Sequence, residues 1–236
     1  PTSTGVLWTL NATSAKNAHA AATLSSFYGY DGQGRLVWQS ADNGAISTFV
    51  YDNANRLVSQ TTTVSGVART TAYEHDAFGQ AVKITDAEGE ISYRYFDKNG
   101  RVVLEADAER YITAIAYNAF GEVDTQTRYR EVAANAGSVS ITVAPTIASG
   151  DTGAVTRYAY DALGRVSHVV DAQNYVTHTT RDAFGDVTQV VRYATAWSGS
   201  GALPSTPGTN DAKTTFSYDR RGLALTTTDA ANAAET

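Results

Sequence analysis

The heptapeptide Tyr160-Asp161-Ala162-Leu163-Gly164-Arg165-Val166 decides the fold of this chain, because variants of it recur along most of the sequence. Close copies occupy residues 30–36, 51–57 and 96–102, and weaker copies begin at residues 75, 117, 181 and 218. The first residues of the copies, called anchors below, are 21, 24, 21, 21, 43, 21 and 37 residues apart. Eight copies at such spacings indicate an array of structural repeats.

Two columns of the repeat have the chemistry of a tight turn. The residue after each anchor is aspartate or asparagine, whose side chain accepts hydrogen bonds from nearby backbone N–H groups. Three residues later stands glycine or asparagine, which tolerate positive φ, so a hairpin loop with a left-handed position is expected. The predicted turn residues are Asp31 and Gly34, Asp52 and Asn55, Asp76 and Gly79, Asp97 and Gly100, Asn118 and Gly121, Asp161 and Gly164, Asp182 and Gly185, and Asp219 and Gly222.

The residues before each anchor alternate with a period of two, which is typical of a β-strand. A serine or threonine stands four residues before every anchor, and a bulky residue often stands two before it. The aromatic anchors, which we expect to stack within the sheet, are Tyr30, Tyr51, Phe96, Tyr117, Tyr160 and Tyr218, while His75 and Arg181 replace them in two copies. A second turn, such as Asp86-Ala87-Glu88-Gly89, divides each unit, so the sequence predicts an all-β array of tandem hairpins with about sixteen strands.

The array is predicted to span residues 26–236 and to contain two insertions. Residues 1–25 are rich in alanine, threonine and asparagine, and are interpreted as a lead-in or an incomplete repeat. The insertion at about 131–154 contains Ser138–Val143, whose alternation predicts an extra strand or hairpin. The insertion at about 194–213 is rich in glycine, serine and proline, and predicts an exposed, partly mobile loop.

Composition excludes several classes of protein. The chain has 236 residues, 42% of them hydrophobic, and a net charge of −6, which argues against a nucleic-acid binder. It has no cysteine, so disulfides and thiolate metal sites are excluded, and it has no run of apolar residues long enough to span a membrane. It also has no methionine, so we expect it to be a segment of a longer protein.

The Tyr-Asp-x-x-Gly-Arg-Leu/Val pattern resembles the YD-repeat (Rhs-repeat) family, which includes bacterial Rhs toxins, shell components of insecticidal toxin complexes and teneurins. The resemblance covers nearly the whole chain. It implies a long β-sheet that spirals into a hollow shell or barrel, and a secreted or cell-surface location. In the bacterial members the shell encloses a toxic C-terminal segment, and in teneurins it is an extracellular scaffold for adhesion.

The sequence also departs from the family pattern. Bacterial shells end in a self-cleavage motif that contains Asp-Pro, whereas none of Pro1, Pro145, Pro204 and Pro207 follows an aspartate. No cleavage site or toxin domain is therefore predicted. Eight repeats are also fewer than we expect a closed shell to need, which favours a wall segment of a larger protein.

Side chains with chemical potential have simple structural interpretations. His168 and His178 lie on neighbouring predicted strands and could approach each other, but two unrelated surface histidines are favoured. The aspartate column could suggest calcium, but turn capping is favoured because the dense oxygen ligands of a calcium loop are missing. A repeated arginine after the turn could bind anionic glycans, but pairing with its own turn is favoured: Arg35, Arg56, Arg101 and Arg165.

Two functional hypotheses remain. The first is a non-catalytic wall that encloses or scaffolds a polypeptide, with the remainder of its own larger chain and an enclosed toxin polypeptide as partners. The alternative is an extracellular adhesion module that binds a glycan or a protein at a cell surface. No catalytic constellation, phosphate-binding loop, metal site or cofactor site is recognised, so no enzymatic activity is predicted.

Overall fold

The computed structural model describes residues 26–41, 43–229 and 234–235, and the predicted lead-in at residues 1–25 lies outside the described residues. The described chain forms one sheet of 17 strands. Their bounds are β1 (Phe27–Tyr30), β2 (Leu36–Ser40), β3 (Ile46–Tyr51), β4 (Leu57–Val64), β5 (Val67–His75), β6 (Ala81–Thr85), β7 (Ile91–Phe96), β8 (Val102–Ala106), β9 (Tyr111–Tyr117), β10 (Val123–Val132), β11 (Ala154–Tyr160), β12 (Val166–Val170), β13 (Val176–Arg181), β14 (Val187–Arg192), β15 (Ala212–Tyr218), β16 (Ala224–Thr228) and β17 (Ala234–Glu235).

Each strand pairs antiparallel with the next strand in the sequence, as a chain of hairpins requires. The register shifts by one residue immediately before most anchors, for example between Val50 and Tyr51 and between Ala159 and Tyr160. Such a bulge accompanies a loop whose last turn residue is left-handed. The all-β array of hairpins predicted from the repeat is therefore confirmed.

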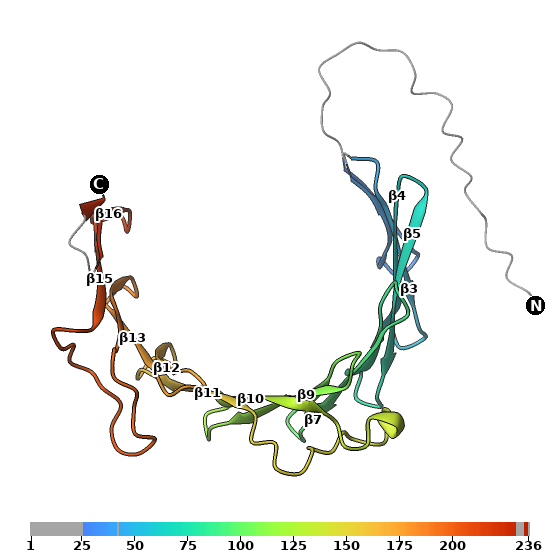
Figure 1. Ribbon diagram of the computed structural model, residues 1–236. Helices are drawn as coiled ribbons and strands as arrows, with labels where there is room; N and C mark the ends of the chain where they lie inside the picture. The colour runs from blue at the N-terminus through green and yellow to red at the C-terminus, as the bar shows by residue number, and fades with distance from the viewer. Residues whose placement is uncertain (1–25, 42, 230–233, 236) are drawn as a thin grey trace, which may run out of the picture.

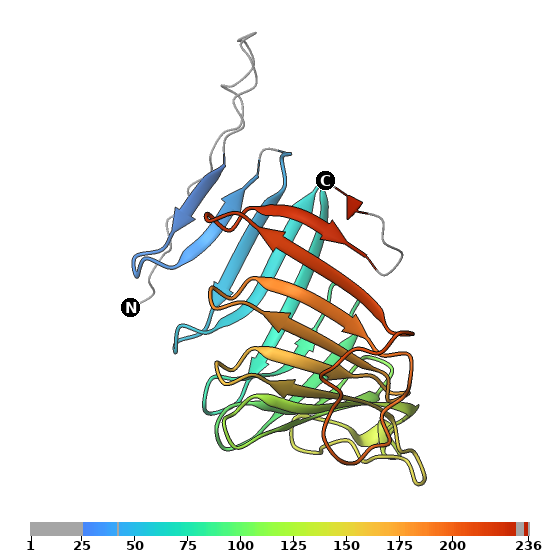
Figure 2. The same ribbon diagram turned by 90° about the vertical axis from the view of Figure 1, so that its left-hand side faces the viewer.

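The sheet curves in one direction, so that its two ends stand apart across an open space (Figure 1). Figure 2 shows the hairpins side by side along this curve, and Figure 1 shows no second layer of described residues over the concave face. The two long loops, residues 133–153 between β10 and β11 and residues 193–211 between β14 and β15, lie on the convex side. Among the described strands, β1 and β17 each pair on one side only.

The few buried apolar side chains gather where these loops cover the convex face. One cluster contains Tyr93, Ala106, Ile112, Ala133 and Val139, and the first three come from β7, β8 and β9. A second cluster, with Val170, Val176, Val191 and Tyr193, packs against Trp197 and Leu203 of the other loop. A single curved sheet cannot bury both faces by itself, so the insertions supply the missing layer.

The predicted strand at Ser138–Val143 is wrong. This segment follows the 3-10 helix η1 (Ala136–Ser138), and its one hairpin-like feature is a pair of hydrogen bonds between the backbones of Ser140 and Val143. It has no strand to join, because β10 already pairs with β9 on one side and β11 on the other. Instead, the Tyr95 hydroxyl donates to the Ser140 carbonyl (2.6 Å) and holds the loop on the sheet.

The loop of residues 193–211 is exposed over most of its length, as its composition predicts, and it is attached to the sheet at several points. Trp197 and Leu203 pack on the sheet, and the backbone N–H of Trp197 donates to the Asn174 carbonyl at 2.8 Å. Asp211 accepts from the backbone N–H groups of Ala194 and Gly208, which ties the two ends of the loop together. No described helix is long and apolar enough to cross a membrane.

Candidate functional site

The eight repeat turns connect successive strands and form a row along one side of the sheet, where the strands end. This row is called the turn row below. In every turn the backbone N–H of the Asx residue donates to the carbonyl four residues later, and the N–H three residues later donates back to the Asx carbonyl. In the first turn, Asp31 Oδ1 also accepts from the N–H groups of Gln33 (2.9 Å) and Arg35 (3.0 Å), and the same two bonds recur in all eight turns. All sixteen predicted turn residues thus lie in the turn row.

The fourth residue after the turn Asx, called the bridge position, connects one turn to the next. Arg35 pairs with Asp31 of its own turn at 2.7 Å, and its Nη1 donates to Asn55 Oδ1 of the next turn, also at 2.7 Å. Arg56 likewise donates from Nη1 to the Asp76 carbonyl at 2.8 Å. The ion pair of each bridge arginine with its own turn was predicted for Arg35, Arg56, Arg101 and Arg165, but the contact with the following repeat was not.

The anchor tyrosines fasten each repeat to the strand before it. The Tyr51 hydroxyl donates to the Leu36 carbonyl at 2.9 Å, and the Tyr117 hydroxyl donates to the Val102 carbonyl at 2.8 Å. Tyr160 and Tyr218 make the equivalent bond. The expected stacking of anchor rings on one another is replaced by this hydroxyl contact, and by guanidinium groups lying over two of the rings.

Besides the positive φ, a lack of space for a side chain also explains why glycine occupies the left-handed position of several turns. Gly164 has φ +73°, and a Cβ built there would lie 2.9 Å from Oε1 of Glu122, the bridge residue of the preceding turn. A Cβ at Gly185 would lie 3.1 Å from Nη1 of Arg165 in the same way. The bridge side chain therefore occupies the space that a side chain at the left-handed position would need. Asn55 reaches φ 64° and instead offers its side chain to the bridge.

Five of the turn aspartates have a lowered pKa, which favours the ionised carboxylate. The backbone N–H of Arg35 chiefly, and then its guanidinium, lower the pKa of Asp31. The same causes lower the pKa of the aspartates at four other turns, in which the N–H four residues later is the largest contributor: Asp52, Asp97, Asp161 and Asp219. This is the electrostatic signature of a capped turn, in which backbone N–H groups and an arginine side chain satisfy the carboxylate oxygens.

Several turn tips present large apolar side chains to solvent. Phe78, Phe120 and Phe184 are each about 90% exposed (90%, 89% and 93%), and Leu163 is 74% exposed. Each stands immediately before the left-handed glycine of its turn. Since phenylalanine is seldom so exposed, these tips are candidate contacts for another polypeptide.

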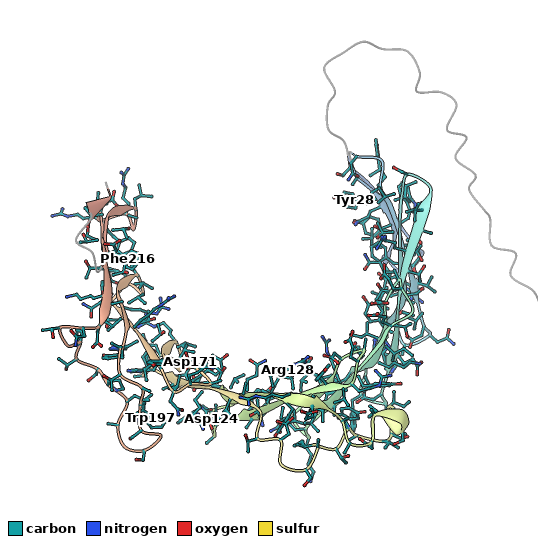
Figure 3. All side chains as sticks on the ribbon, in the orientation of Figure 1. Tyr28, Asp124, Arg128, Asp171, Trp197 and Phe216 are labelled. Atoms are coloured by element: carbon teal, nitrogen blue, oxygen red, sulfur yellow. The ribbon has the colours of Figure 1, made fainter. Side chains whose placement is uncertain are left out.

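The concave face carries a mixture of aromatic, hydroxyl and charged groups. Figure 3 shows the side chains of Tyr28, Arg128 and Phe216 on the concave side and that of Trp197 on the convex side. Tyr28 and Phe216 stand two residues before their anchors, and Arg128 lies opposite Thr113 in the register. None of these three groups lies under a second layer, so the concave face is available to contents of the curve.

The two histidines of the neighbouring strands β12 and β13 are stacked rather than unrelated, which corrects the favoured interpretation. His168 in β12 lies directly opposite His178 in β13, with ring centroids 4.2 Å apart and ring planes 1° from parallel. His168 Nε2 is 3.2 Å from the Pro204 carbonyl of the convex loop, and His178 Nδ1 is buried without a partner in the described part of the chain. No group of three metal-ligand side chains occurs among the described residues.

The stacked histidines should make stability depend on pH. Burial, and for His168 also the neighbouring His178, lowers the pKa of both rings. Because the histidines of the unfolded chain bind protons more readily, falling pH favours unfolding. The contribution of the two neutral rings to the free energy of unfolding is complete above about pH 6.5 and is lost as the pH falls. We expect the urea midpoint to fall between about pH 7 and pH 5, and to fall less in His178→Gln. A His75→Gln control should keep the full slope; equal slopes in all three proteins would contradict this.

The fold and the turn row together define an open array of stacked β-hairpins that are bonded turn to turn along one edge. Comparison with known families agrees with this architecture. The RHS Repeat model matches residues 30–68, 51–91, 75–111 and 160–196, which together cover half of the chain. The chain belongs to the RHS repeat family. A comparison with curated proteins found no match.

One solved structure supports the same fold, and others match with lower scores. The crystal structure of TcdB2-TccC3 superposes with a TM-score of 0.54 at 13% identity, and the match covers 86% of this chain and 12% of that one. A Tc holotoxin pore from Photorhabdus luminescens matches with a TM-score of 0.41 at 13% identity, over 89% of this chain and 15% of that one. This chain therefore spans about an eighth of the TcdB2-TccC3 chain.

Proposed function

We propose that this chain is a non-catalytic wall segment of a larger RHS protein that encloses or scaffolds a polypeptide cargo. The observation that carries the proposal is the uninterrupted sheet, which curves around an open space and leaves its concave face uncovered. The side chains that would face a cargo are of mixed polarity, as suits a surface that holds a polypeptide without forming a core with it.

The arrangement of the stabilising contacts supports the same role. The bridge arginines and anchor tyrosines join successive repeats, so the array extends by adding identical connections. The aspartates with lowered pKa values serve turns and loop anchors, and the two loops sit on the convex side, away from the enclosed space. In this proposal the wall is secreted or displayed at a cell surface, and its toxin cargo belongs to the same larger protein.

Limited proteolysis of the natural full-length protein, followed by mass spectrometry, tests the proposal. A cargo segment should remain intact while the wall is folded and become digestible once the wall unfolds. A Gly164→Val version, whose wall should unfold at a lower denaturant concentration, should release the cargo to the protease correspondingly earlier. A Gly32→Ala version should behave like the natural protein, because the space around Gly32 is open.

Free cleavage of all flanking segments under native conditions would contradict enclosure. The adhesion function would then be favoured, since the exposed tips Phe78, Phe120 and Phe184 offer apolar contacts outside the curve of the sheet. In that case the partner would be a cell-surface protein or glycan rather than an enclosed polypeptide.

A further inference from the structure

Three steps of the turn row lack a bridge arginine, namely those at Gln80, Glu122 and Asp186. Between the seventh and eighth turns the bridge position holds Asp186, where four other repeats have arginine. An open cavity of about 1020 Å³ lies at this step, and Asp186, Tyr218 and Asp219 are among the residues that line it. The anchor is nevertheless in its usual place, because the Tyr218 hydroxyl donates to the Val187 carbonyl at 2.9 Å.

The steps that contain a bridge arginine indicate which group would fit this cavity. The guanidinium carbon of Arg35 lies 4.9 Å from the ring centroid of Tyr51, and that of Arg101 lies 4.4 Å from the ring centroid of Tyr117. At the second step, Arg56 donates to the carbonyl of the next turn aspartate. At the first step, an aromatic face, a carboxylate and a backbone carbonyl thus surround the guanidinium group of Arg35, and the other bridge arginines make part of the same set of contacts.

The same three groups are present at the open step, but without their cation. Tyr218 supplies the ring, and the Asp219 carbonyl is the equivalent of the one that accepts from Arg56. The carboxylates of Asp182 and Asp186 form no ion pair with any described residue, and Asp186 Oδ2 would lie 3.8 Å from a Cβ at Gly222. Two arginines of this chain, Arg220 and Arg221, also line the cavity. Arg221 is paired with Asp219 at 3.1 Å, and Arg220 is exposed.

We propose that this cavity is a binding site for an arginine side chain of another polypeptide segment. The incoming guanidinium lies over the Tyr218 ring, pairs with the carboxylates of Asp182 and Asp186, and donates to the Asp219 carbonyl. Phe184, exposed at the preceding tip, covers the aliphatic part of the arginine. The proposal stands independently of what the wall encloses.

The other steps without arginine do not meet these requirements. Glu122 at the fifth turn accepts from the Asn118 amide at 2.7 Å, so its carboxylate is already engaged. The cavity of about 590 Å³ beside Gln80 has Phe96 as its anchor, and its bridge position holds the neutral amide of Gln80 instead of a carboxylate. The acidic cavity with a tyrosine anchor is therefore specific to the step at Asp186.

Titration with N-acetyl-arginine methylamide, followed by NMR of the isotope-labelled full chain, tests the site. Saturable shifts are expected at Asp186, Tyr218 and Gly222, with a dissociation constant in the millimolar range because the contacts are partly exposed. The neutral N-acetyl-citrulline methylamide, which has nearly the same shape, should bind at least about tenfold more weakly. An Asp186→Asn variant should lose about the same factor for the arginine compound, while keeping its backbone hydrogen bond to Asp182.

A second variant fills the site from within. Asp186→Arg restores the bridge, so it should abolish binding of the arginine compound and raise the melting temperature by about 2 °C. Glu109→Arg makes the same change of charge at an exposed residue in a different turn, and should alter neither binding nor melting temperature appreciably. Equal binding of arginine and citrulline compounds, or a lower melting temperature in Asp186→Arg alone, would overturn the proposal.

The source of the arginine can be found by repeating the titration on the longer natural protein. Absence of the shifts there, with binding retained by the 236-residue chain, identifies an arginine of the parent chain as the occupant. Shifts in both proteins identify a separate polypeptide. Absence of saturable shifts in both proteins would overturn the site itself.

Discussion

Replacing Gly164 by valine is expected to lower the free energy of unfolding by about 3 kcal/mol. A β-branched residue is strongly disfavoured at φ +73°, and its Cβ would lie 2.9 Å from Glu122 Oε1. The valine would therefore strain its own turn and displace the bridge from the preceding one. Urea unfolding monitored by circular dichroism measures the loss.

Two substitutions in other turns isolate the cause. Gly32 lies in a turn too, but without positive φ or any atom within 4 Å of a built Cβ, so Gly32→Ala should be neutral within about 0.5 kcal/mol. Asn55→Gly relieves the strain of φ 64° but removes the 2.7 Å contact from Arg35, and it should also stay within about 0.5 kcal/mol. An unchanged midpoint in Gly164→Val would show that the left-handed glycine is not required.

The fold was predictable because its information is local and repeated. Each turn is specified by an Asx residue and by a glycine or asparagine three positions later, and Asn118 and Asn55 show which chemistry each column needs. Alternation between the turns then specifies strands, and short loops leave antiparallel pairing of neighbours as the simple outcome. Eight repetitions make this pattern stand out from the background of a single sequence.

The contacts between repeats were not predictable, because they depend on register and curvature. Nothing in the local sequence indicates that Arg56 reaches the carbonyl of Asp76, twenty residues later. The stacking of His168 on His178 likewise follows from the pairing of β12 with β13, in which these two residues lie directly opposite each other. A column read along the chain shows what a residue does in its own turn, but not which space it fills in the next.

The first insertion was misjudged for a related reason. Ser138–Val143 has the alternation of a strand, yet both neighbouring positions in the sheet are already taken. Whether a segment becomes a strand depends on a free edge as well as on its own preference. The loop containing Trp197 has the composition of an exposed segment, and composition alone did not indicate that Trp197 and Leu203 would pack on the convex face.

The convex cluster beneath residues 133–153 should carry a large share of the stability. Ile112 in β9 is fully buried, lies opposite Ala106 of β8, and belongs to the cluster that the loop covers through Ala133 and Val139. Ile112→Ala should lower the free energy of unfolding by about 3 kcal/mol, because the cavity left beneath the loop cannot close without moving the sheet.

Ile115 provides the matched control, since it lies on the same strand and, three residues away, on the opposite face. Its side chain is only partly buried, so Ile115→Ala should cost about 1 kcal/mol. Equal losses in the two variants would contradict the assignment of the core to the convex side. A markedly larger loss for Ile112 would mean that packing on the convex face stabilises the curved sheet. A sheet stabilised on its convex face needs no core on its concave face, so the concave face can stay open to whatever the wall surrounds.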